Sequence, residues 1–332
     1  MIRALWSSPH ATPWQAVAAQ VKGYDRSVLL VRLFYACGLL LVVQSMSDWP
    51  ALLEVEAMAS PWPSAWIPRD AVPTVIPWIL GSYLVAALLA ASLPAWRLAR
   101  LAYFVMYVQY VSLISGFGGI SHNNHTWLWI SGLLVVLPNR GWSDGVRAER
   151  RHYFLTVIGV CQLFALFFYT LTGFWKVVFA LHGAVTDRAS TLGLDGFGTM
   201  IAQQQMRFNQ DPVLADFLIG TPVVAWAVFL GTIYVETAAV IVTFRPRLHR
   251  AWGVLLISFH VGTELAMGFT FLPNILVAAI FFVGSPFAPD RTAVRDALFD
   301  LPGVRVVRRR QVRPWRSRAG RTRNPSIEAP AR

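Results

Sequence analysis

The chain has 332 residues, of which 55% are hydrophobic and only 14% are charged. This composition is too apolar and too poor in charge for an ordinary soluble domain, so a lipid bilayer is the expected partner of most of the chain. The two cysteines, Cys37 and Cys161, lie in separate apolar stretches and form no CxxC pair, which argues against a disulfide framework or a dithiol oxidoreductase.

The net charge of +12 is concentrated near the C-terminus, where twelve arginines lie between Arg291 and Arg332. The run 305–323 (RVVRRRQVRPWRSRAGRTR) carries no signature of a folded nucleic-acid-binding module. It is typical of a disordered tail beside anionic lipid. We therefore expect no nucleic-acid partner.

Apolar stretches recur along almost the whole chain and predict an all-α, polytopic membrane bundle of about eight helices. The first stretch is too long for the apolar part of a signal peptide and is expected to remain as the first membrane helix. The stretches are 27–46, 72–93, 101–119, 125–137, 153–181, 222–244, 251–270 and 272–287.

The loops between these stretches alternate in basic charge. The N-terminal segment 1–26 and the turns after the second, fourth and sixth stretches are rich in Arg and Lys, whereas the intervening loops are poor in them. By the positive-inside rule, this pattern predicts eight crossings of the cell membrane with both termini in the cytoplasm. Segment 27–287 is then one transmembrane domain, followed by a basic cytoplasmic tail, 288–332.

The longest outer connection, 182–221, contains about forty residues. This is too long for a simple turn, so we expect short amphipathic helices that lie over the bundle.

Ionisable side chains within the apolar stretches are the candidate functional residues, because each costs about 2.5–3.5 kcal/mol on insertion scales. Lys176 is prominent because the chain has only two lysines against twenty-seven arginines. A desolvated lysine can lose its proton and serve as a general base or nucleophile. The equally weighted alternative is a lysine that snorkels to the outer head groups.

Each of the other ionisable residues has a structural and a functional interpretation. His125 can be an interfacial histidine held by Asn123 or Asn124, and His260 a buried polar contact between helices. The topology places Lys176 and His125 near the outer face, His260 and Glu264 at middle to outer depth, Glu236 at middle to inner depth, and Arg32 near the inner end of its helix. Glu236 and Arg32 are expected to join helices.

Metal binding is the competing chemical hypothesis. His122 and His125 are spaced i, i+3, and His260 and Glu264 are spaced i, i+4, so each pair could present two ligands on one helical face. Neither pair forms an established ligand motif, and we predict no metal site.

Three segments together resemble the vitamin K-dependent gamma-carboxylases and the wider HTTM (horizontally transferred transmembrane domain) family. They are NNHTWL at 123–128, YTLTGFWK at 169–176, and FHVGTELAMG at 259–268. They are similar to the family's NNH motif, its Gly-x-x-Lys stretch and its Phe-His helix, in the same order. Arg32 and Glu236 are supporting matches, and the resemblance covers roughly residues 22–287.

The resemblance implies that Lys176 is a catalytic base that deprotonates a reduced quinone, and that His125 and His260 orient that quinone. Asn124, Trp175 and Glu264 are then the candidate cofactor-binding residues. If the chain is an enzyme, the resemblance implies a carboxylase-like lyase or a quinol-dependent membrane enzyme.

Two departures from the family pattern limit these implications. No Trp follows Lys176 in the run VVFALHG, and the chain lacks a large lumenal C-terminal portion, so carboxylation of protein glutamates is not expected. Short HTTM proteins include relatives of a membrane protein that matures a sporulation-delaying peptide toxin. A non-enzymatic accessory for maturation or export of a secreted peptide is therefore the alternative, and a transporter is disfavoured because no repeats are apparent.

Overall fold

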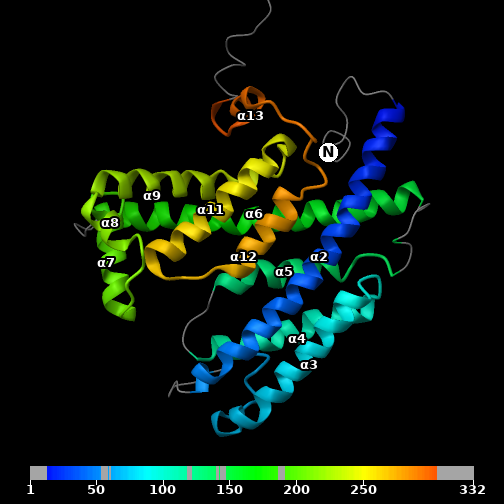
Figure 1. Cartoon of the computed structure of the whole chain (residues 1–332), viewed down its shortest axis with the longest axis horizontal. Coiled ribbons are helices and arrows are strands. Elements are labelled where there is room, and N and C mark those ends of the chain that lie inside the picture. The colour runs from blue at the N-terminus through cyan, green and yellow to red at the C-terminus, as the bar shows by residue number, and fades with distance from the viewer. Residues whose placement is uncertain are drawn as a thin grey trace, which may run out of the picture.

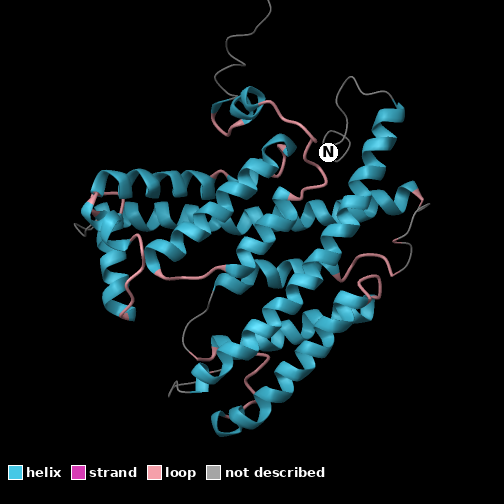
Figure 2. Cartoon of the chain, in the orientation of Figure 1, coloured by secondary structure: helices cyan, strands magenta, loops and turns pink. Residues whose placement is uncertain are grey.

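A computed structural model describes residues 13–53, 59, 61–117, 122–139, 142, 147–185 and 191–304. Within these residues the structure contains helices and loops but no strand (Figure 2). The all-α prediction is therefore confirmed. The predictions for the arginine-rich run 305–323 and for residues 1–12 fall outside the described residues.

Four helices are long and apolar enough to cross a membrane, which identifies the chain as a membrane protein. They include the expected first, second, third and fifth stretches, and the corresponding spans are Val21–Ser47, Arg69–Ser92, Arg97–Ser115 and Ala148–Gly183. The other predicted stretches form helices that are shorter, interrupted or, in the seventh, less apolar. The fourth is α5 (His125–Leu134), the seventh is α11 (His249–Met267), and the eighth is α12 (Leu272–Val277), which continues into a π-helix, Ala278–Val283.

Three helices at the N-terminal side pack together in one group (Figure 1). They are α2 (Pro13–Leu53), α3 (Val72–Ser92) and α4 (Arg97–Ser115). Stacked tyrosines fill the space between α3 and α4, and the Tyr83 and Tyr103 rings lie 5.6 Å apart. Trp127 of α5 donates a hydrogen bond of 2.9 Å to the Tyr103 hydroxyl, so the first residues of α5 are anchored on this group.

The second group is built around α6 (Ala148–Val185), a helix of 38 residues. Helix α9 (Pro222–Thr237) runs antiparallel beside it (Figure 1). A break separates α9 from the short α10 (Ala239–Val242), and the Thr170 hydroxyl spans that break. It donates to the Glu236 carbonyl at 3.2 Å and accepts from the Val240 amide at 2.9 Å. The sixth predicted stretch is thus two helices whose exposed backbone groups are satisfied by a side chain of α6.

Two short helices occupy the segment 182–221, namely α7 (Gly196–Phe208) and α8 (Ala215–Gly220). They contact α9 and α11 and form what we call the cap (Figure 1). The Leu214 amide donates to the Leu265 carbonyl at 2.8 Å. Helix α11 ends at Gly268, which has φ +75°, and a Cβ built on it would lie 2.2 Å from Gln210 Oε1. The left-handed backbone at 268 is what favours glycine there, because the Gln210 amide is the end of a flexible side chain that can move.

A fully buried arginine, Arg100, lies at the opposite end of α5 from His125. Its guanidinium donates to the Pro94 carbonyl at 2.6 Å and to the Leu137 carbonyl, and lies 5.3 Å from the Trp142 ring centroid. The charge therefore satisfies carbonyls just beyond the end of a helix, where a cation is favoured.

Ion pairs join segments that are distant in sequence near the opposite side of the molecule from the cap. Asp290, in the loop before α13 (Val294–Asp300), accepts from both Lys22 and Arg26 of α2. Hydrogen bonds from Lys22 and Arg26 lower the pKa of Asp290 to about 2. The N-terminal helix is thereby fastened to the segment that follows the π-helix.

Candidate functional site

A cavity of about 350 Å³ lies within the second group of helices, beneath the cap. Its wall is mostly aromatic and aliphatic, with a few polar groups, which is typical of a small-molecule site. The residues come from five helices of the bundle, from α7 and from the loop before α12. They are His125, Thr126, Phe168, Tyr169, Thr172, Lys176, Phe197, Met200, Phe229, Thr232, Glu236, Phe259, His260, Thr263, Met267, Phe269, Phe271 and Asn274.

Helix α6 supplies four lining residues because they share one helical face. Tyr169, Thr172 and Lys176 follow the i, i+3, i+7 spacing, and Phe168 lies beside them. Gly173 lies on the adjacent face, against α9. A Cβ built on Gly173 would lie 2.7 Å from both Glu236 Cβ and the Thr237 amide nitrogen. The glycine therefore lets α6 and α9 approach closely, and this approach brings Lys176 to Glu236.

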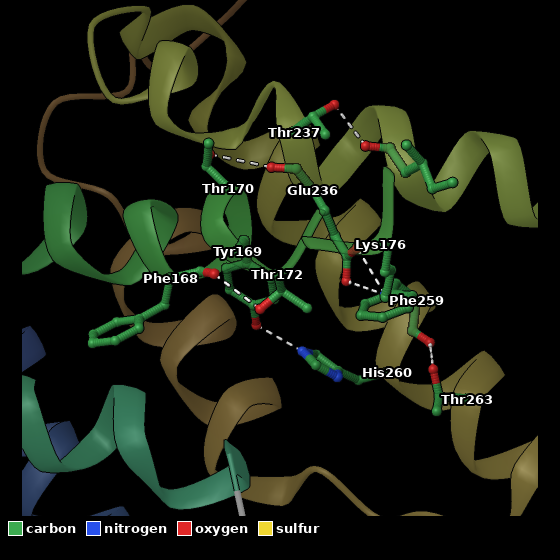
Figure 3. Close-up of polar contacts among 11 residues, drawn as sticks. Phe168, Tyr169, Thr170, Thr172, Lys176, Glu236, Thr237, Phe259, His260 and Thr263 are labelled. Carbon is green, nitrogen blue, oxygen red and sulfur yellow. Dashed lines mark hydrogen bonds and ion pairs between the residues drawn. The ribbon is translucent and has the colours of Figure 1, made fainter. Parts of the chain in front are cut away.

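Lys176 and Glu236 form the charged pair of the cavity (Figure 3). The Lys176 Nζ lies 2.7 Å from each carboxylate oxygen of Glu236. The side chain of Glu236 is only 2% exposed, whereas that of Lys176 is 29% exposed. The ammonium also lies 5.3 Å from the centroid of the Phe259 ring. The carboxylate is thus the deeply buried partner and the ammonium the more exposed one, and both residues line the cavity.

Tyr169 and His260 form a second polar pair in the same cavity. The Tyr169 hydroxyl lies 2.6 Å from His260 Nε2, and Figure 3 shows the two side chains pointing toward each other. His260 is buried, and its Nδ1 has no hydrogen-bond partner among the described residues. The same holds for Oδ1 of Asn274, another lining residue. Two buried polar atoms at this wall are therefore left without a protein partner.

The structure brings together the three residues that the sequence nominates for catalysis, Lys176, His125 and His260. It adds Glu236, which sequence reasoning treated as a contact between helices at a deeper level in the membrane. Glu236 does join two helices, but it does so as a lining residue of the cavity at the level of Lys176. Its ionisable side chain within an apolar stretch was the signal that marked it.

The candidate cofactor-binding residues Asn124, Trp175 and Glu264 lie away from this cavity. Trp175 is 67% exposed on the outer surface of α6. The exposed Glu264 accepts a hydrogen bond of 3.1 Å from Thr270. Asn124 accepts one of 2.9 Å from Tyr107 and lines a separate, more polar cavity of about 130 Å³. The NNH turn therefore contributes to both cavities, with His125 at the apolar one.

Arg32 also lies outside the cavity and is exposed on the surface of α2. The side chain of His122 falls outside the described part of the chain. In the part of the chain that the structure describes, no group of three or more His, Cys, Asp or Glu residues is placed to hold a metal ion.

The fold and cavity define a class: an all-helical membrane protein with an apolar internal cavity that contains one ammonium–carboxylate pair and one tyrosine–histidine pair. Comparison with protein-family models, with curated proteins and with solved structures gave no match. The resemblance to the HTTM family therefore remains a prediction from the three motifs.

Proposed function

We propose that the chain is a membrane enzyme, similar to the HTTM and gamma-carboxylase proteins, that binds a lipophilic ligand with an acidic O–H group and removes its proton. A reduced quinone has this chemistry, with a polar head and an apolar body. The single observation that carries the proposal is the Lys176–Glu236 pair in an otherwise apolar cavity. Ionisable groups held out of water in a cavity are the usual means of proton transfer.

The division of polar and apolar groups in the cavity supports this ligand class. The pair and the tyrosine–histidine contact lie along one part of the wall, where a ligand hydroxyl can form hydrogen bonds. Phe168, Phe229 and Phe271 supply apolar surface for the remainder of the ligand. A volume of about 350 Å³ lies within the range of drug-sized ligand sites.

Binding of a reduced quinone with a short isoprenoid tail tests this function. The protein is placed in lipid nanodiscs, and binding is followed by the fluorescence of the quinol. We expect saturable binding that Lys176→Ala and His125→Ala each weaken by about tenfold or more, a change of about 1.4 kcal/mol. Trp175→Ala is the matched control, because Trp175 is the neighbour of Lys176 on α6 but lies outside the cavity. Absence of binding by the wild-type protein would refute the proposal.

We further place both termini in the cytoplasm with eight crossings, so that the cavity lies in the outer half of the bilayer. The alternation of basic loops supports this topology. Single cysteines introduced at Arg97 and at Asp211, in a chain from which Cys37 and Cys161 have been removed, test it. An impermeant maleimide should label position 211 in intact cells and position 97 only after lysis.

A second candidate function rests on the outer surface of the cap. Four large apolar side chains are exposed there, at Met206, Phe208, Val213 and Phe217. Such a surface suits an apolar peptide, as expected of an accessory for a secreted peptide. Photo-crosslinking from position 206 in cells distinguishes the two functions, because only the accessory should yield a peptide adduct at that position.

A further inference from the structure

The charge state of the Lys176–Glu236 pair determines which group can accept a proton. An ammonium within 2.7 Å of both carboxylate oxygens is an ion-paired donor, and an ammonium has no lone pair with which to act as a base. The carboxylate of Glu236 does have lone pairs. A desolvated carboxylate is also the member of the pair that gains most from protonation when its counter-ion turns toward another anion.

We propose that Glu236, through Lys176, is the proton acceptor for the O–H group of the bound ligand. This inference rests on the proposed function and deepens it. Lys176 contacts both carboxylate oxygens and is the more exposed member of the pair, so it can pass one proton to Glu236 while it takes one from the ligand.

The step balances in atoms and charge. The ligand O–H bond breaks, one N–H bond of Lys176 breaks and another forms, and an O–H bond forms on Glu236. The cavity begins with an ammonium, a carboxylate and a neutral ligand. It ends with an ammonium, a neutral carboxylic acid and a ligand anion, and no electrons are transferred. The ammonium that neutralised Glu236 now stabilises the anion.

Contacts with two residues of α6 hold Glu236 in its position. Its carbonyl accepts from the Thr170 hydroxyl, and its Cβ packs against the bare Cα of Gly173. The other titratable groups that line the cavity are His125, His260 and Tyr169, and of these His260 and Tyr169 are engaged with each other. Among the described lining residues, Glu236 is the single carboxylate.

An alkylated nitrophenol is the probe for this relay, because its phenolate absorbs visible light and its neutral form does not. The protein is titrated in nanodiscs at a pH at which the free phenol is mostly neutral, and binding and ionised fraction are measured separately. We expect wild-type protein to bind the phenol largely as the phenolate. In wild type the phenol proton should stay on Glu236, so that almost none is released to the medium. In Glu236→Gln the unpaired Lys176 ammonium still attracts the phenolate, but about one proton should be released for each phenolate bound, as measured by titration calorimetry in buffers of different ionisation enthalpy.

Glu264→Gln is the matched control, because Glu264 is an acid of the neighbouring helix α11 outside the cavity, and it should behave as wild type. If Glu236→Gln binds the phenolate with as little proton release as wild type does, or if wild type releases one proton for each phenolate bound, the relay is overturned while the proposed ligand site stands. If the wild-type protein binds neither the phenol nor the reduced quinone, the proposed function fails and the relay fails with it.

A measurement on the wild-type protein keeps the proposal testable if Glu236→Gln does not fold. Infrared difference spectra recorded as the phenol binds should show a new carboxylic acid C=O band that rises with the phenolate absorbance, in wild type and in Glu264→Gln alike. Formation of phenolate without that band would show that another group takes the proton, and would overturn the relay.

Discussion

Gly173 and Glu236 are in such close contact that a single methyl group on Gly173 would lie 2.7 Å from Glu236 Cβ. Real side chains do not approach this closely, so the contact between α6 and α9 depends on the missing side chain. Lys176 lies one helical turn further along α6, and its reach to Glu236 follows from the same contact. The Gly-x-x-Lys spacing thus has a direct physical explanation in this chain.

Gly173→Ala is expected to destabilise the protein by about 1–3 kcal/mol, because the added methyl overpacks the contact and pushes α6 from α9. Thermal unfolding in detergent measures the effect. Gly231→Ala is the control, because a Cβ on Gly231 of α9 would meet nothing within 4 Å. The explanation is wrong if the two variants are equally stable.

Removal of one partner of the Lys176–Glu236 pair should lower the stability of the folded protein more than removal of both. Lys176→Met leaves a carboxylate that is 2% exposed without its counter-ion, and is expected to cost about 3–5 kcal/mol. The double variant with Glu236→Leu should recover part of that loss, because no buried charge remains. A double-mutant cycle by chemical denaturation gives the coupling, and additive losses would contradict the pairing.

Tyr169→Phe should destabilise the protein by about 1–3 kcal/mol, since it leaves the buried His260 Nε2 without a partner. Tyr153→Phe serves for comparison. Its hydroxyl also makes one hydrogen bond, to the Val136 carbonyl at 3.1 Å, but the residue is 48% exposed and water can replace the hydroxyl. Equal losses in the two variants would argue against the buried contact.

Arg100→Met is expected to cost about 1–3 kcal/mol for each buried carbonyl that loses its donor, here those of Pro94 and Leu137. Arg97→Met tests the specificity of this effect. Arg97 is exposed, and its backbone amide, not its side chain, donates to Asn139. The Arg97→Met variant should therefore be about as stable as the wild-type protein.

Acid should weaken the ion pairs that Asp290, in the loop before α13, forms with Lys22 and Arg26 of α2. Hydrogen bonds from Lys22 and Arg26 depress the pKa of Asp290 to about 2 in the folded state, from an ordinary value of about 3.8. A depressed carboxyl pKa contributes stability that is full above the unfolded value and is lost as the pH falls through the folded value. Asp290→Asn should therefore differ from wild type at neutral pH and converge with it between about pH 4 and pH 2. A difference in melting temperature that stays constant over this range would show that the ion pairs of Asp290 do not stabilise the folded protein.

The sequence predicted the helical class and three residues of the cavity because both depend on local chemistry. Apolar stretches mark helices, and an ionisable residue inside one is conspicuous. The rotation of each helix was harder to predict. Trp175 is turned about 100° from Lys176 around α6 and faces outward. On α11, Thr263 and Met267 share the cavity face of His260, whereas Glu264 does not.

The pairing of Lys176 with Glu236 was hidden for a different reason. The end of the fifth apolar stretch, 181, understates how far Lys176 lies from the end of its helix, because α6 continues to Val185. The sixth stretch, 222–244, also contains a break after Thr237. Glu236 therefore lies at the end of a short helix rather than in the middle of a long one. Hydropathy does not report such a break, because the side chain that fills it, Thr170, belongs to another helix.

The backbone conformation of Gly268 restricts the substitutions that are possible at the C-terminal end of α11. Its φ of +75° strains any residue with a Cβ, whereas the nearby amide of Gln210 is the end of a flexible side chain that can move aside. Gly262, less than two turns earlier on the same helix, has open space around it. In natural variants that keep the cap, position 262 can take other residues. Position 268 should stay glycine as long as the cap packs against the end of α11.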